Sequence, residues 1–184
     1  MSILLEKRLE ESRRDIAVTV ACAVPKRPRM ERVVEKLTEI GVEAILPLSA
    51  ERTIPRMKGE EEAKKVLRFR KIAAQTAKQC GVSRLPEISK IFSFTEVLGL
   101  SRAYDLALFL DPEGRPLQEC LKGKIAKRVI VAVGPEGGWS ERELEEAGKM
   151  GWEPASLGKY ILKVDTACLA AVAILHYALD PLEK

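Results

Sequence analysis

The sequence contains no asparagine, a single histidine and four cysteines scattered along its 184 residues. The cysteines form no Cys-x-x-Cys pair and no cluster with histidine, so a zinc site is not expected and no metal is predicted. Free, mostly buried thiols are the simpler interpretation. The lack of asparagine beside many lysines, arginines and glutamates is typical of thermophilic proteins, some of which form intracellular disulfides.

A long apolar run is also missing. The longest, residues 166–179, has 14 residues and includes His176, whereas a membrane-spanning helix needs about 20. The first residues contain no apolar region of the signal-peptide type. The sequence therefore predicts a cytoplasmic protein that does not enter a membrane. Its length and the lack of a Ser/Gly/Pro-rich linker predict a single domain over residues 1–184.

Apolar runs alternate with amphipathic segments along the chain. Strands are expected at residues 16–24, 42–48, 105–110, 128–134 and 154–158, and helices at 29–41, 60–81, 94–100, 140–150 and 165–179. The strands are continuously apolar, which is typical of a parallel sheet buried on both faces. The sequence therefore predicts an α/β fold with helices covering both faces of a parallel sheet.

Positive charge is concentrated in the middle of the chain. Residues 51–90 hold 11 Lys/Arg against 5 Asp/Glu, whereas residues 91–184 hold 11 against 14. The basic segment could face a polyanion such as RNA. A solvated helix face would explain the same pattern.

The stretch GPEGG, residues 134–138, interrupts the chain directly after an apolar strand, and Ser140 can cap the helix that follows. Ligands of α/β sheets bind at the carboxyl ends of strands, where glycines let the backbone approach a ligand closely. A phosphate is not expected, because the loop lacks both GxxxxGK[ST] and GxGxxG and carries Glu136. A neutral or cationic ligand bound by the backbone fits better, and a plain tight turn fits as well.

A second loop, within SLGKYILKVDTACLAA at residues 156–171, is apolar although it connects a strand to a helix. Such a loop either contacts an apolar or aromatic ligand or packs into the core, and the residues alone leave both open.

Together these loops resemble the SPOUT class of RNA methyltransferases, and more closely the 16S ribosomal RNA uracil-N3 methyltransferases. The resemblance rests on GPEGGWSERE (134–143) and LGKYILKVDTACLAA (157–171). It extends upstream through EKLTEIGVEAILPLSAERT (35–53) and AKQCGVSRLPEI (77–88), and so covers nearly the whole chain.

The resemblance implies a trefoil knot within about residues 105–179, which general topology rules would not suggest. It also implies a homodimer with the final helix at the interface, and S-adenosylmethionine as the cofactor, held between three loops. The cofactor-binding residues expected on this basis are Leu110, Gly134, Pro135, Glu136, Gly137, Gly138, Leu157, Gly158, Ile161, Leu162, Thr166 and Ala167.

For catalysis we assign Lys163 to stabilise charge on the uracil oxygens, and Asp165 to orient it or to accept the proton. They stand where the family has arginine and glutamate, and a charge pair at a helix start would explain them equally. Arg52 and Arg84 are candidate RNA contacts. The family's arginine near Arg84 is Val82 here.

The family also has an N-terminal RNA-binding domain that is not recognised in this sequence. Reduced RNA recognition, a protein partner, or the basic 51–90 segment would account for that difference.

From the resemblance, the predicted function is methylation of uridine N3 in small-subunit ribosomal RNA. The alternatives are a SPOUT enzyme acting on another RNA, such as tRNA or a ribose 2′-hydroxyl, and a knotted RNA-binding protein without catalysis. A Rossmann-type nucleotide-binding enzyme fits less well, because GxGxxG is missing.

Overall fold

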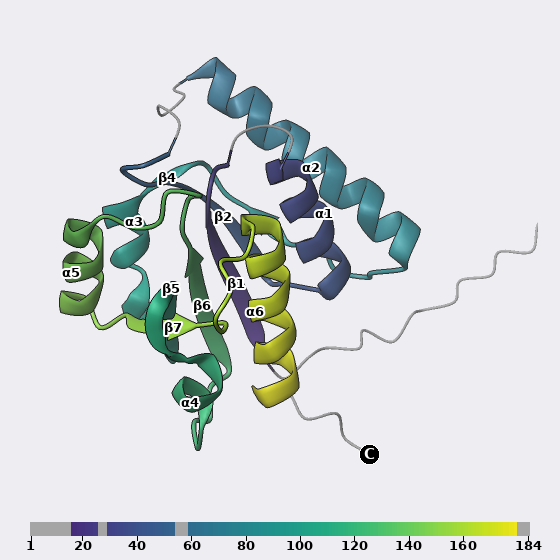
Figure 1. Cartoon of the computed structure of the whole chain (residues 1–184). Helices are drawn as coiled ribbons and strands as arrows, with labels where there is room; N and C mark the ends of the chain where they lie inside the picture. The colour runs from purple at the N-terminus through teal and green to yellow at the C-terminus, as the bar shows by residue number, and fades with distance from the viewer. Residues whose placement is uncertain (1–15, 26–28, 54–58, 180–184) are drawn as a thin grey trace, which may run out of the picture.

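The computed structural model describes residues 16–25, 29–53 and 59–179 (Figure 1). Its strands are β1 (Ala17–Ala23), β2 (Ala44–Ser49), β3 (Glu87–Ile88), β4 (Phe92–Ser93), β5 (Leu106–Pro116), β6 (Arg128–Val133) and β7 (Glu153–Ser156). Its helices are α1 (Arg29–Ile40), α2 (Glu60–Cys80), α3 (Phe94–Leu98), α4 (Leu117–Leu121), α5 (Glu141–Lys149) and α6 (Val164–Leu179), with a 3-10 turn, η1 (Ser101–Ala103).

The strands form one sheet in the order β3-β2-β1-β6-β5-β7, with β4 also pairing with β2. Every pairing among the described strands is parallel. The predicted parallel α/β sheet is therefore confirmed. Because parallel strands end on the same side, the segments that follow β1, β2, β6 and β7 meet along one edge, which we call the carboxyl edge.

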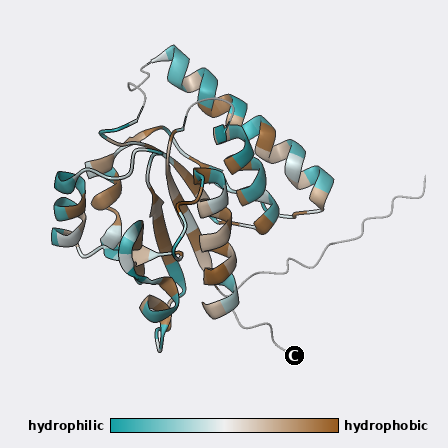
Figure 2. Ribbon diagram, in the orientation of Figure 1, coloured by the Kyte–Doolittle hydropathy of each residue, from teal (hydrophilic) through white to brown (hydrophobic). Residues whose placement is uncertain are grey.

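Two apolar cores lie on opposite faces of the sheet. Along β1, Val18, Val20 and Cys22 belong to the core beneath α1, α2, α4 and α6. Ala21 and Ala23 belong to the core beneath α3 and α5. Hydrophobic colouring follows the strands, whereas the outer faces of α2 and α5 are hydrophilic (Figure 2). This alternation explains why the strand runs are apolar without interruption.

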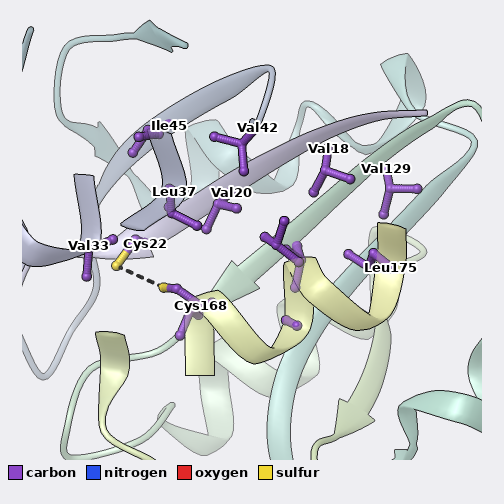
Figure 3. Packing of buried hydrophobic residues seen from close by; sticks show 14 of the residues in the cluster. Val18, Val20, Cys22, Val33, Leu37, Val42, Ile45, Val129, Cys168 and Leu175 are labelled. Atoms are coloured by element: carbon purple, nitrogen blue, oxygen red, sulfur yellow. Dashed lines mark hydrogen bonds between the residues drawn. The ribbon is translucent and has the colours of Figure 1, made fainter. Parts of the chain in front are cut away.

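The C-terminal helix α6 packs on α1 and on the central strands β1 and β6. Its Cys168 lies against Cys22 of β1, with the Cys168 thiol donating to the Cys22 sulfur at 3.7 Å (Figure 3). This contact and the burial of the thiol raise the pKa of Cys168. All four cysteines are free. Cys22, Cys120 and Cys168 are buried and Cys80 is exposed, so most of the thiols are buried, as the sequence predicts.

Strand β5 is longer than the sequence predicts. It pairs with β7 as far as Leu110, is interrupted, and pairs again at Arg115. Gly114 lies in the interruption, where an added Cβ would come within 2.7 Å of the Ala155 backbone nitrogen. The predicted end at Asp111 is wrong because pairing with β7 resumes at Arg115 after the interruption. The elements β3, β4 and α4 have two to five residues each, too few to show a periodic pattern.

Within the described part of the chain, no helix is both long and apolar enough to cross a membrane. The same residues contain no group of three or more His, Cys, Asp or Glu side chains placed to hold a metal ion.

Candidate active site at the carboxyl edge

A cavity of about 650 Å³ opens at the carboxyl edge, between the ends of β5, β6 and β7. Its size is in the range of small-molecule sites, roughly 300–1,000 Å³. Three segments line it, which are residues 110–113, 133–139 and 155–164. Eleven of the twelve residues predicted to bind a cofactor lie around this one cavity, and Thr166 is the exception. A smaller cavity of about 250 Å³ lies between α1 and α2 and contains none of them.

The Gly134–Gly138 loop forms one wall of the cavity. It closes as a tight turn in which the Gly138 N–H donates to the Pro135 carbonyl at 2.9 Å, and Gly138 has a φ of 68°. The backbone N–H groups of Glu136 and Gly137 have no hydrogen-bond partner among the described residues. Both residues are exposed and line the cavity, so these N–H groups can pair with water or with a ligand. Arg29 of α1 forms an ion pair with Glu136 and offsets its charge.

Trp139 joins the loop to the other strand ends. It is buried, and its indole N–H donates to the Leu110 carbonyl at 2.9 Å. The ring also lies against Phe94 of α3, with centroids 5.3 Å apart. Gly134 is required beneath it, because an added Cβ would approach the ring to 2.9 Å. The Trp139 side chain thus holds together the strand ends at residues 110 and 134, which are far apart in the sequence.

The α5 helix begins directly after Trp139 with the predicted capping box. The Ser140 hydroxyl accepts the Glu143 N–H, and the Glu143 carboxylate accepts the Ser140 N–H at 2.9 Å. Glu143 is buried, and its other oxygen accepts the Glu51 N–H at 2.8 Å. A buried carboxylate is stable here because N–H groups supply the hydrogen bonds that water would otherwise provide.

The second loop, residues 157–163, forms the opposite wall. Leu157 and Leu162 pack against the main core, whereas Tyr160 and Ile161 are 85% and 86% exposed. Gly158 is held through the Ser156 hydroxyl at 3.3 Å. The loop therefore presents both a packed apolar side and two large unburied side chains at the mouth of the cavity.

The predicted catalytic residues lie where this loop joins α6. Lys163 lines the cavity and is exposed, and its side chain makes no hydrogen bond or ion pair with another described residue. Asp165 lies in the first turn of α6, and its buried Oδ1 atom has no hydrogen-bond partner among the residues that the structure describes. Thr166 is exposed on the helix and does not line the cavity.

The two predicted RNA contacts lie far apart. Arg52 follows β2 at the carboxyl edge, and its guanidinium donates to the Gly137 carbonyl at 2.8 Å. Arg84 lies near the beginning of β2, where it forms an ion pair with Glu43. The structure therefore brings Arg52, but not Arg84, to the cavity wall.

Sequence reasoning missed several residues that line the cavity, including Arg29, Glu113 and Tyr160. Tyr160 lies within LGKYILK, a stretch that carries the family resemblance, so the sequence could have identified it as a cavity residue. Arg29 is the first residue of α1, and Glu113 lies in the interruption of β5. No local sequence pattern marks either of them as a cavity residue.

Comparison with known proteins agrees with this geometry. Residues 12–176 match the family described as the RNA methyltransferase domain. The ribosomal RNA small subunit methyltransferase E of Synechocystis is 32% identical over 96% of this chain, and that of Bacillus subtilis is 27% identical over 95%. This chain spans 58% of the Synechocystis protein's length and 71% of the Bacillus protein's.

Solved structures are similar as well. A methyltransferase from Legionella pneumophila, solved with bound SAM, superposes with a TM-score of 0.84 at 29% identity. The match covers 91% of this chain and 69% of that one. A ribosomal RNA small subunit methyltransferase E from Neisseria gonorrhoeae, bound to S-adenosyl methionine, gives 0.79 at 28% identity, covering 91% and 68%. Since the family match covers most of the chain, the protein belongs to the RNA methyltransferase domain family.

Proposed function

We propose that this chain is an S-adenosylmethionine-dependent RNA methyltransferase and that it methylates N3 of a uridine in 16S ribosomal RNA. The observation that carries the proposal is the cavity of about 650 Å³ built from three strand-end loops, around which eleven of the twelve predicted cofactor-binding residues lie. Relatives of known name are small-subunit ribosomal RNA methyltransferases, and two similar structures contain the same cofactor.

The residues around the cavity fit S-adenosylmethionine. Its polar groups can pair with backbone N–H groups of the Gly134–Gly138 loop, and apolar side chains such as Leu110, Leu157 and Leu162 can contact the adenine. The cavity wall contains no cluster of cations of the kind that a phosphate ligand would favour. When bound, S-adenosylmethionine supplies an electrophilic methyl group on its sulfonium.

The chain's own contribution is to position uracil and to stabilise the charge that develops on it. As the new bond to N3 forms and the carbon–sulfur bond breaks, the N3 proton must leave. Lys163 lies at the cavity with an unpaired ammonium group, which suits it to stabilise negative charge on a uracil oxygen. The unpaired Oδ1 of Asp165 can accept a donor, either the Lys163 ammonium or the departing proton.

Two finer features belong to the same proposal. A trefoil knot would thread the chain within about residues 105–179 around the cofactor. The interrupted pairing of β5 with β7, where Gly114 closely approaches Ala155, lies within that region. A homodimer would cover the free face of α6, where Leu169, Ile174 and Tyr177 are 36%, 37% and 89% exposed. Helices that are apolar on all sides are normally buried, and a two-fold dimer is the commonest way to bury one.

RNA would approach the carboxyl edge, where Arg52 lies. The lysines and arginines of α2 come after its acidic first turn, Glu60–Glu62, so they would contact RNA farther along the helix. Arg84 and a partner protein remain candidates for contacts farther from the cavity. The rival enzyme, acting on another RNA or on a ribose 2′-hydroxyl, uses the same cavity and cofactor and differs only in its product.

The test is methyl transfer to unmodified small-subunit ribosomal RNA, followed by mass spectrometry of the nucleosides. We expect 3-methyluridine. A 2′-O-methylated product, or a product only on tRNA, would support the rival enzyme. Binding of both RNA and cofactor without any product would identify a non-catalytic binding protein, and a chain that does not bind S-adenosylmethionine in a calorimetric titration would refute the proposal.

A further inference from the structure

The short turn that follows β2, residues 50–53, packs on the Gly134–Gly138 loop although more than eighty residues separate them. Arg52 Nη1 donates to the Gly137 carbonyl at 2.8 Å. Its aliphatic stem lies over the same glycine, because a Cβ added there would meet Arg52 Cδ at an ordinary contact distance of 3.5 Å. Arg52 therefore contacts the loop with its charged end and its stem.

The bond from Arg52 fixes one particular peptide group. The peptide between Gly137 and Gly138 has its carbonyl bonded to Arg52 and its N–H bonded to the Pro135 carbonyl at 2.9 Å. A peptide bonded on both sides cannot rotate without breaking a hydrogen bond. The neighbouring N–H groups of Glu136 and Gly137, which have no partner of their own, are thereby kept in one orientation.

The turn itself is anchored to the start of α5. The Glu51 N–H donates to the buried Glu143 carboxylate at 2.8 Å, and the Ser140 hydroxyl donates to the Glu51 carboxylate at 2.8 Å. Glu143 and Ser140 also cap α5. Arg52 is therefore attached to the same rigid helix end that follows the glycine loop, so the distance between its backbone and Gly137 varies little.

We propose that Arg52 is a positioning residue for the cofactor loop, held there by the Glu51–Glu143 anchor. It sets the affinity for S-adenosylmethionine by fixing the 137–138 peptide. The inference rests on the proposed function and extends it, because an arginine expected to contact RNA instead acts on the cofactor side. Only one of the five N–H donors of its guanidinium is used by Gly137.

The binding test compares wild type with Arg52→Ala, Arg52→Lys and a control, Arg142→Ala. Arg142 is also an exposed arginine, at the start of α5, and its hydrogen bond and ion pair are with Glu146. Its interaction with Glu51 is only a weaker coulombic one, and it makes no hydrogen bond to the glycine loop. Isothermal titration should show the dissociation constant for S-adenosylmethionine rising about tenfold in Arg52→Ala, as expected for loss of a charge-assisted hydrogen bond. Arg52→Lys should recover most of the affinity, because an ammonium can also donate to one carbonyl. Arg142→Ala should bind as wild type does.

A second measurement needs no ligand. Hydrogen exchange of the ligand-free protein should be faster at Gly138 in Arg52→Ala than in wild type and unchanged in Arg142→Ala, with thermal unfolding of all variants at nearly the same temperature. If wild type fails to bind the cofactor but exchange still responds to Arg52, the proposed function fails and the positioning role stands. Unchanged exchange, or unchanged cofactor affinity beside a raised KM for RNA, would overturn the positioning role.

Discussion

The two loops that form opposite walls of the cavity are built in different ways. The Gly134–Gly138 loop is held from three directions by Arg52, by the Arg29–Glu136 ion pair, and by Trp139 bonded to Leu110. The backbone of the 157–163 loop is bonded to one side chain, the Ser156 hydroxyl, which accepts the Gly158 N–H and donates to the Gly158 carbonyl, and Tyr160 and Ile161 are 85% and 86% exposed.

This difference indicates which wall of the cavity is complete in a single chain and which wall is not. The first loop has its shape before any ligand binds, so the cost of ordering it has already been met during folding. The second loop exposes large apolar side chains beside the free face of α6, which is what we expect of a wall completed by RNA and by a second copy of the chain. Changes in the first loop should therefore affect cofactor affinity, and changes to the exposed side chains of the second loop, such as Lys163, should affect turnover or assembly.

The sharpest test of this division is Lys163→Ala. Removing the cation expected to stabilise the transition state should lower kcat about 100-fold or more, whereas the dissociation constant for S-adenosylmethionine should change less than about threefold. Single-turnover methyl transfer and calorimetric titration measure the two quantities. Lys163→Arg is the matched control, and it should retain most activity because the charge is kept. A parallel loss of cofactor affinity in Lys163→Ala would break the division.

Assembly is tested by Ile174→Asp on the free face of α6. A buried carboxylate at the proposed dimer interface should weaken dimerisation by about 2 kcal/mol or more, roughly 30-fold, as measured by sedimentation equilibrium. Leu67→Asp is the control, since Leu67 is 53% exposed on α2, away from α6. A wild-type chain that stays monomeric at micromolar concentration would contradict the dimer.

The main elements of the fold follow from sequence patterns alone. The buried stripe of α2, the continuous strands and the capping box at Ser140 are consequences of local spacing, and each is present. The cofactor segments could be located only through the family resemblance of GPEGG and LGKYILK, because the residues alone left a tight turn and core packing open. Eleven of the twelve residues predicted in this way lie around one cavity.

The remaining features depend on contacts between distant parts of the chain. Pairing of β5 with β7 resumes at Arg115, where Gly114 lies against Ala155, whereas DPEGR alone is an ordinary turn sequence. The role of Arg52 could not be predicted either, because an exposed arginine in a basic segment suggests RNA. Its bond to Gly137, 85 positions away, is visible only in three dimensions.

Gly134→Ala tests how strongly the first loop depends on Trp139. The new Cβ would come within 2.9 Å of the indole ring, so the tryptophan must move and its bond to Leu110 should weaken. We expect a loss of about 1–3 kcal/mol in unfolding free energy and a several-fold loss of cofactor affinity. Gly148→Ala in α5 is the control, because an added Cβ there meets nothing within 4 Å. Equal effects at both positions would show that the indole contact is unimportant.

The smallest expected effect is an acid weakening of α3, which supports the first loop through Phe94 and Trp139. Hydrogen bonds from the Ser93 N–H and hydroxyl, with Lys90, lower the pKa of Glu96 from its ordinary 4.5 to about 2. A depressed carboxylate pKa stabilises the fold fully above pH 4.5, and the contribution is lost as the pH falls toward 2. Glu96→Gln should therefore be less stable than wild type at pH 7 and nearly equal to it at pH 2.

Tryptophan fluorescence can follow unfolding of this region, since Trp139 contacts Phe94 and Trp152 donates to the Leu98 carbonyl. Because Glu96 is exposed, the difference should be modest, and a difference that grew with acid would contradict the capping role.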